Sequence, residues 1–293
     1  MNKKIHVWTY WHSQELPERV NECIGSWKRY LNPDKFKIVI LSEENVRDFL
    51  PPGWLEPIPD FQDLHLGGQA DFIRLSLLKF YGGVWLDASI YLYQDISYIE
   101  SFERFYAPKL PWLDHSNVQT WFLVAPRDNE VINKWLSLYI EVLCKRKQLR
   151  IPWYHLSMYC GIGLNGLILL DRKFTTYFKV YEVFADIYRK DEDFRKIIPR
   201  KGTYGVQATW RLDNFLKIWK GICLYALSKP FEKLSSSPDP LNLKKAAMQI
   251  WVKEQLPSLT LKRNGKVILC KLNAADRNLL PADFRFESAD PTG

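Results

Sequence analysis

Apolar and mixed segments alternate through the first 130 positions of this chain. Residues 5–11 form a strand-like apolar run, and residues 16–31 carry apolar side chains at helical spacing. Residues 36–41 form a second run, rich in β-branched side chains and typical of a buried strand. Strand and helix signals that alternate in this order predict an α/β domain with a mainly parallel sheet.

The segment from Gly67 to Ser89 predicts a helix, a glycine stop and a strand in succession. Apolar residues first recur at helical spacing, Gly82-Gly83 then supplies conformations that end a helix, and an apolar strand follows. Asp87 comes directly after this strand. Ligands bind at the carboxyl edge of open α/β sheets, so Asp87 is a candidate site residue. A carboxylate at this place needs a partner to offset its desolvation, and a divalent cation would serve.

Asp71 and Arg74 form a second polar feature on the predicted helix. Their spacing of three residues places them on one helix face, at the same sheet edge as Asp87. Two interpretations stay open for this pair. It is either an ordinary exposed ion pair, which contributes little to stability, or part of a ligand site.

The second half of the chain carries helical patterns and one hairpin signal. Helical spacing dominates from residue 129 to residue 188, and Asn264-Gly265 separates the apolar runs 259–263 and 266–269 as a hairpin turn would. No run is long and apolar enough for a transmembrane helix, and no signal peptide is evident. The five cysteines are odd in number and form no C-x-x-C pair. They are typical of buried thiols in a reducing, cytoplasmic compartment.

The formal net charge of +8 on 293 residues implies an anionic partner. Nucleic acid is disfavoured because no RNP, helix-turn-helix or zinc pattern is present. The basic residues concentrate in the second half of the chain. They fit either peripheral docking on an anionic membrane or an ordinary solvated basic face, and they are Lys145, Arg146, Lys147, Arg150, Lys244, Lys245, Lys253, Lys262, Arg263, Lys266 and Lys271.

The motif A-D-x-x-R followed by Y-G-G-V-W-L-D, with its last aspartate sixteen residues after the first, resembles the donor-site signature of glycosyltransferase family 32 and the capsular polysaccharide synthesis proteins. The resemblance implies a GT-A fold, which is an α/β, Rossmann-like nucleotide-sugar-binding domain with a mixed, mainly parallel sheet. A helical and β-hairpin C-terminal part would complete it. Residues 1–130 would bind the donor, and residues 131–293 would form the acceptor-binding helical region and the C-terminal basic segment of the same catalytic unit.

The resemblance also implies roles for individual residues. Asp87 and Arg74 would be catalytic, with Asp87 meeting a metal on the donor diphosphate and Arg74 contacting the sugar or diphosphate. Asp71 would bind the ribose or the sugar, and either Trp8 or Trp11 would line the base pocket. The full donor-binding set is Trp8, Trp11, Asp71, Arg74, Trp85, Asp87 and Ser89.

The metal implied by the resemblance is Mn²⁺ or Mg²⁺, both of which prefer oxygen ligands. The family motif is often Asp-x-Asp, whereas this chain has Asp87-Ala88-Ser89, so Ser89 is a ligand either directly or through water. A later residue is the alternative. The candidates are Asp95, Asp114, His115, His155 and Asp213, and His65 is a further polar group near the helix.

The function that these features predict is a metal-dependent glycosyltransferase of bacterial surface polysaccharide synthesis, of capsule or O-antigen type. Its donor would be a UDP-sugar and its acceptor a glycan or a lipid-diphosphate-linked glycan. The resembling family retains anomeric configuration. An inverting enzyme would instead need a base such as Asp114 or His155, and Asp114, His115 and His155 are the candidates for contacting the acceptor. A non-catalytic carbohydrate-binding or nucleic-acid-binding protein is the alternative class.

Overall fold

A computed structural model of the chain describes residues 4–58, 61–64, 66–97, 104–108, 118–145, 179–198, 206–208, 259–263 and 266–271. Two 3₁₀ turns, Val46–Phe49 and Phe61–Asp63, accompany the regular elements. The α-helices and β-strands of the described residues are, in chain order, β1 (Ile5–Tyr10), α1 (Glu18–Tyr30), β2 (Phe36–Leu41), α2 (Leu66–Tyr81), β3 (Gly83–Leu86), β4 (Ile90–Leu92), β5 (Phe122–Ala125), α3 (Glu130–Lys145), α7 (Lys179–Lys190), α8 (Glu192–Ile197), β6 (Val206–Ala208), β7 (Leu259–Arg263) and β8 (Lys266–Lys271).

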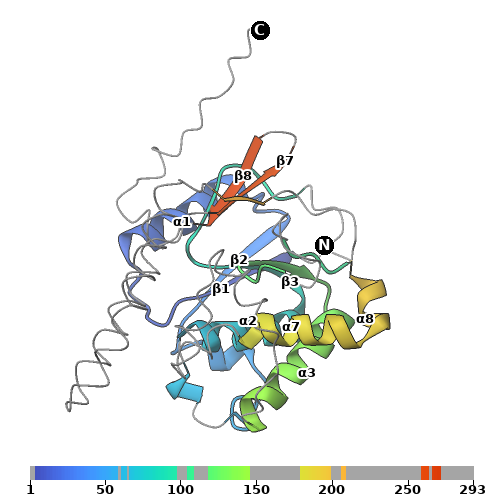
Figure 1. Cartoon of the computed structure of the whole chain (residues 1–293). Coiled ribbons are helices and arrows are strands. Elements are labelled where there is room, and N and C mark those ends of the chain that lie inside the picture. The colour runs from blue at the N-terminus through green and yellow to red at the C-terminus, as the bar shows by residue number, and fades with distance from the viewer. Residues whose placement is uncertain are drawn as a thin grey trace, which may run out of the picture.

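The first sheet has the strand order β2-β1-β3-β5 (Figure 1). Strand β1 pairs in parallel with β2 and with β3, and β5 runs antiparallel to β3. The α/β class with a mixed, mainly parallel sheet is therefore confirmed. The predicted first strand, first helix and second strand correspond to β1, α1 and β2.

Helices cover both faces of this sheet, and because side chains alternate along each strand, successive residues pack on opposite faces. Trp8 and Trp85 pack on one face with α2, α3 and α7, which lie together on that side in Figure 1. Val7 and Val84 point to the other face and pack with the buried side of α1. The tight packing on both faces fixes the strand ends from which the site residues project.

A second, antiparallel sheet has the strand order β4-β8-β7-β6. The predicted hairpin is confirmed as β7 and β8, and β8 extends to Lys271, two residues beyond the predicted run. Helix α1 ties β4 to the first sheet, because the Trp27 indole donates to the Ile90 carbonyl at 2.7 Å. This second sheet therefore brings residues from the end of the chain beside the segment that follows β3.

The glycine stop between α2 and β3 is confirmed. Gly82 and Gly83 have φ angles of 67° and 103°, and the Gly82 amide donates to the Leu78 carbonyl at 3.0 Å. Glycine adopts such angles without steric cost. The stop lets the chain leave the helix and enter the sheet within two residues, which places Asp87 at the end of a short buried strand.

We expect Gly83→Ala to destabilise the fold by roughly 3 kcal/mol. An added methyl group would meet the backbone carbonyl of His6 on the paired strand, and the φ angle of 103° is strained for alanine. Urea unfolding measures the effect. Gly25→Ala is the matched control, because an added Cβ at this position of α1 has nothing within 4 Å. A Gly83→Ala protein as stable as Gly25→Ala would contradict the argument.

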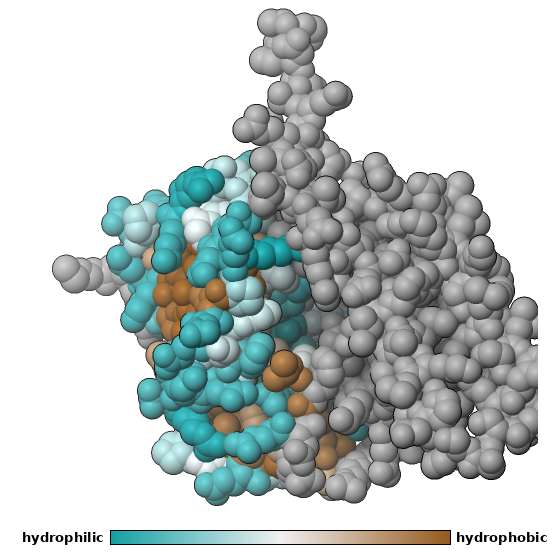
Figure 2. Space-filling model, turned by 90° about the vertical axis from the view of Figure 1, so that its left-hand side faces the viewer, coloured by the Kyte–Doolittle hydropathy of each residue, from teal (hydrophilic) through white to brown (hydrophobic). Residues whose placement is uncertain are grey.

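The described surface is mostly hydrophilic on the face shown in Figure 2, with hydrophobic side chains in patches between polar ones. Leu66, Tyr81 and Ile197 are the large hydrophobic residues exposed on the described part of the chain. Within the same ranges, no helix has the length and apolar character that a bilayer crossing requires.

Candidate active site

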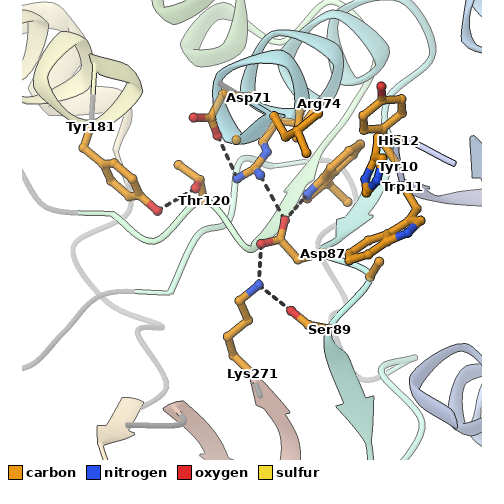
Figure 3. Close-up of a pocket in the computed structure, with 15 residues that line it drawn as sticks. Tyr10, Trp11, His12, Asp71, Arg74, Asp87, Ser89, Thr120, Tyr181 and Lys271 are labelled. Atoms are coloured by element: carbon orange, nitrogen blue, oxygen red, sulfur yellow. Dashed lines mark hydrogen bonds and ion pairs between the residues drawn. The ribbon is translucent and has the colours of Figure 1, made fainter. Parts of the chain in front are cut away.

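A pocket with a volume of about 270 Å³ opens at the carboxyl ends of β1 and β3 (Figure 3). Its walls come from α2, α7, the end of β8 and the segments that follow β1 and β3. The lining residues are Tyr10, Trp11, His12, Leu66, Gly67, Ala70, Asp71, Arg74, Trp85, Asp87, Ala88, Ser89, Thr120, Tyr181 and Lys271. The pocket therefore lies at the sheet edge that the sequence indicates.

Asp87 is the centre of the polar network in this pocket. Its Oδ1 accepts hydrogen bonds from Arg74 at 3.0 Å and from the Trp85 indole at 2.8 Å, and its Oδ2 accepts one from Lys271 at 2.7 Å. Burial opposes ionisation, but the charges of Arg74 and Lys271 and these hydrogen bonds outweigh it. The pKa of Asp87 consequently lies well below its ordinary value, and the carboxylate is ionised at neutral pH.

Lys271 is a site residue that the sequence interpretation missed. The sequence places it among the basic residues of a membrane-docking or solvated face, whereas in the structure its side chain is only 17% exposed and also donates to the Ser89 hydroxyl at 2.6 Å. A signal was present in the sequence. Lys271 directly follows the apolar run from Val267 to Cys270, just as Asp87 directly follows the apolar strand before it. A charged side chain at the end of a buried strand needs a partner of opposite charge to offset its desolvation.

The pair of Asp71 and Arg74 is buried, not exposed. The two side chains lie 3.2 Å apart, and each residue is 4% exposed. Arg74 also lies over the Trp85 ring, 5.1 Å from its centroid, and so bridges two carboxylates above an aromatic face. The interpretation as part of a site is favoured over that of a surface ion pair.

Asp71 has a less favourable environment than Asp87. Burial raises the pKa of Asp71 to about 7; the Asp87 charge adds to this shift, whereas Arg74 and Lys271 oppose it. The charge of the pocket therefore changes near neutral pH. Below the pKa of Asp71 the cluster of Asp71, Arg74, Asp87 and Lys271 carries one net positive charge, and above it the cluster is neutral.

The raised pKa of Asp71 predicts a stability change with pH. Stability from this group is complete below its unfolded pKa of about 4 and is lost as pH rises through about 7. We expect wild type to lose about 3 kcal/mol more than Asp71→Asn between pH 4.5 and pH 8, measured by urea unfolding. Burial also raises the pKa of Glu182 to about 7, but Glu182 is present in both proteins and cancels in the comparison. Equal pH profiles would contradict the prediction.

The three tryptophans of the predicted donor set differ in position. Trp11 lines the pocket beside His12, and their ring centroids are 5.2 Å apart. Trp85 also lines the pocket, and its ring packs against the guanidinium group of Arg74. Trp8 does not line the pocket. It is 1% exposed, packs into the core beneath the sheet and donates its indole N–H to the Gly82 carbonyl at 2.9 Å. Of the two alternatives for the base pocket, the structure therefore favours Trp11.

The described residues do not fit a divalent cation at the predicted place. Both oxygens of Asp87 already accept hydrogen bonds from cationic or indole donors, and the Ser89 oxygen accepts one from Lys271. No group of three or more His, Cys, Asp or Glu side chains in the described ranges is arranged to hold a metal. The cation that contacts Asp87 and Ser89 in this structure is an ammonium group.

Of the remaining polar candidates, Asp95 alone belongs to the part of the chain that the structure describes. Asp95 accepts a hydrogen bond from the backbone amide of Ser97 and does not line the pocket. The other candidates lie outside the described residues, and their roles stay predictions. They are His65, Asp114, His115, His155 and Asp213.

The fold and the pocket together define an α/β protein with a charged pocket at the carboxyl edge of its sheet. The family model of the capsular polysaccharide synthesis proteins matches residues 1–165, which is more than half of the chain. The chain belongs to this family.

Similarity extends to curated fungal proteins. The chain is 25% identical over 210 residues to the O-glycosyltransferase braB of Annulohypoxylon truncatum, covering 59% of this chain and 48% of that protein. It is 26% identical over 144 residues to the O-glycosyltransferase PaGT of Phomopsis amygdali, covering 45% and 34%. The chain thus spans half or less of the length of these relatives. Among solved structures, the PaToxG glycosyltransferase aligns with a TM-score of 0.41 and 12% identity over 66% of this chain and 73% of that one.

Proposed function

We propose that this protein is a glycosyltransferase that moves a sugar from a nucleotide-sugar donor, with UDP as the nucleotide, to a glycan or a lipid-diphosphate-linked glycan. The observation that carries the proposal is the cluster of Arg74, Asp87 and Lys271 at the carboxyl edge of the sheet. One ionised carboxylate holds two cations in a pocket that is also lined by the half-buried side chain of Trp11. Such a pocket suits a ligand with both an anionic and an aromatic part.

The chemistry follows from the charges. When a glycosidic bond to a diphosphate breaks, negative charge builds up on the leaving group, and cations fixed beforehand stabilise it without reorganising. Arg74 offers a planar fork of donors suited to phosphate oxygens or vicinal hydroxyls. Asp87 orients both cations, and Trp11 offers a flat surface for the base. Asp71 holds Arg74 from the other side.

The family and the relatives support this class of enzyme. The matching family is described by capsular polysaccharide synthesis, and four curated relatives are named as glycosyltransferases. The finer proposal is a role in bacterial surface polysaccharide synthesis, with docking on an anionic membrane that carries the acceptor. The family resemblance implies a dependence on Mn²⁺ or Mg²⁺, but this proposal does not include it, because Asp87 and Ser89 are already bound by Arg74, Trp85 and Lys271.

The proposed reaction retains anomeric configuration. None of the described residues presents an unshared carboxylate to the pocket as a dedicated nucleophile, since Asp71 and Asp87 are both ion-paired. We infer a same-face displacement in which the leaving phosphate helps to deprotonate the acceptor. Proton NMR of the product tests this inference: an α-linked product from an α-linked donor is expected, and a β-linked product would refute retention.

Donor hydrolysis and transfer test the proposed function directly. Purified protein is incubated with a panel of UDP- and GDP-sugars, each with EDTA and with Mn²⁺, and the released nucleotide is measured. We expect release from at least one UDP-sugar by wild type. Glycan binding with no nucleotide release from any donor would instead indicate a non-catalytic carbohydrate-binding protein.

A further inference from the structure

The ammonium group of Lys271 lies where the family motif would place a metal ion. It donates to Asp87 at 2.7 Å and to Ser89 at 2.6 Å, and these are the first and third residues of the Asp-Ala-Ser triplet (Figure 3). A cation that joins an Asp-x-Asp pair would contact the same two positions. Compared with an Asp-x-Asp motif, the chain has serine in place of the second aspartate. It also has a lysine whose ammonium group contacts both Asp87 and Ser89.

The two differences offset one another in charge. An Asp-x-Asp pair carries two negative charges and suits a divalent ion, whereas Asp87 with Ser89 carries one and suits a monovalent cation. A divalent ion at this place would have to displace Lys271 from both partners. It would also lie close to two positive groups, since Arg74 holds the other oxygen of Asp87.

Lys271 is also placed to meet a ligand. Its side chain is 17% exposed and lines the pocket, so it is neither fully enclosed nor free in bulk water. An ammonium group has three N–H donors, and the described contacts with Asp87 and Ser89 use two of them. Among the described residues nothing takes the third, so it can serve an acceptor in the pocket, such as a phosphate oxygen.

We propose that Lys271 supplies the positive charge at the donor diphosphate that a divalent ion supplies in an Asp-x-Asp site, and that this protein therefore binds its nucleotide without a metal. The inference rests on the proposed function, because it assumes that a nucleoside diphosphate occupies the pocket. It adds a binding residue and replaces the predicted cofactor with a side chain. Ser89 then positions the lysine and is not a metal ligand.

Nucleotide binding to the unaltered 293-residue chain tests the inference without any variant. Isothermal titration with UDP, and separately with GDP, is carried out in EDTA and then in Mn²⁺. We expect the affinity of wild type for its preferred nucleotide to agree within about threefold between the two conditions. Binding that requires Mn²⁺ would overturn the role of Lys271 but leave the proposed function standing. No binding of either nucleotide in either condition would overturn both.

Variants then assign the effect to the lysine. Lys271→Met keeps the length of the side chain and removes its charge, and it should weaken binding in EDTA by roughly 10- to 100-fold. Lys271→Arg should restore most of the affinity. Lys196→Ala is the matched control, because it removes a surface lysine that pairs with acidic residues outside the pocket, and it should bind like wild type. Unchanged affinity of a folded Lys271→Met protein would overturn the proposal.

A double variant tests the exchange of a lysine for a metal in reverse. Lys271→Met combined with Ser89→Asp removes the ammonium group and restores the Asp-x-Asp spacing with Asp87. We expect its nucleotide affinity to rise at least tenfold on addition of Mn²⁺, whereas that of wild type does not. Absence of a Mn²⁺ response in the double variant, confirmed as folded by circular dichroism, would count against the equivalence of the two cations.

Discussion

Asp87→Asn is expected to lower the turnover of sugar transfer by roughly 100- to 1,000-fold. Asparagine removes the negative charge that holds Arg74 and Lys271 at 3.0 Å and 2.7 Å, and its amide N–H₂ faces a donor in at least one of these contacts. The two cations then lose their fixed positions. Misplacement of such groups by about 1 Å is enough for a loss of this size.

The same variant should affect binding much less than turnover. Removing one negative charge makes the pocket more positive, so we expect its affinity for UDP to stay within about tenfold of wild type. Turnover with saturating donor and titration with UDP separate the two effects. Asp48→Asn is the matched control, because Asp48 is an exposed residue of the 3₁₀ turn Val46–Phe49 and does not line the pocket. Full turnover by Asp87→Asn would refute the assignment of the site.

Arg74→Met should destabilise the protein by about 3–5 kcal/mol, the range for breaking a buried ion pair by removal of one partner. The residue is 4% exposed and bridges Asp71 and Asp87, so its loss leaves Asp71 buried beside another carboxylate. The pKa of Asp71, already raised to about 7, would rise further without the guanidinium group. The carboxyl group would then be neutral over a wider pH range.

The cost of Arg74→Met should therefore depend on pH. At pH 8, wild type gains from the attraction between Arg74 and ionised Asp71, whereas at pH 5.5 Asp71 is protonated and that attraction is absent. Urea unfolding should show a larger difference between wild type and variant at pH 8 than at pH 5.5. Adding Asp71→Asn should recover part of the loss at pH 8. A destabilisation that is equal at both pH values would show that packing, and not charge, dominates.

The arrangement of the segment from Gly67 to Ser89 could be predicted from the sequence because its signals are local. Helical spacing, two adjacent glycines and a short apolar run determine α2, the stop and β3 within about 20 residues, and Asp87 follows from them. Likewise, β1 and β2 were predicted from continuous apolar runs. The antiparallel direction of β5 was not predicted, because strand direction depends on the path of the chain between the strands.

The partners of Asp87 could be predicted only in part. Arg74 lies on α2, the helix that precedes β3 in the same motif, and the sequence places it at the sheet edge where Asp87 lies. Lys271 reaches the site because β8 pairs with β4, which begins at Ile90, and no local pattern indicates a pairing across such a sequence distance. The choice between Trp8 and Trp11 was also open, since it depends on which side chain points into the packed core and which lies beyond the end of β1.

The long separation between Asp87 and Lys271, 184 residues, has a consequence for the order in which the protein is made. At bacterial and eukaryotic rates of translation of about 5–20 residues per second, Asp87 leaves the ribosome roughly 10–40 s before Lys271. During that interval β4 lacks β8 as its pairing partner, and the aspartate has Arg74 and Trp85 but not its second cation. A chain interrupted before β8 would therefore have an α/β core without a finished pocket.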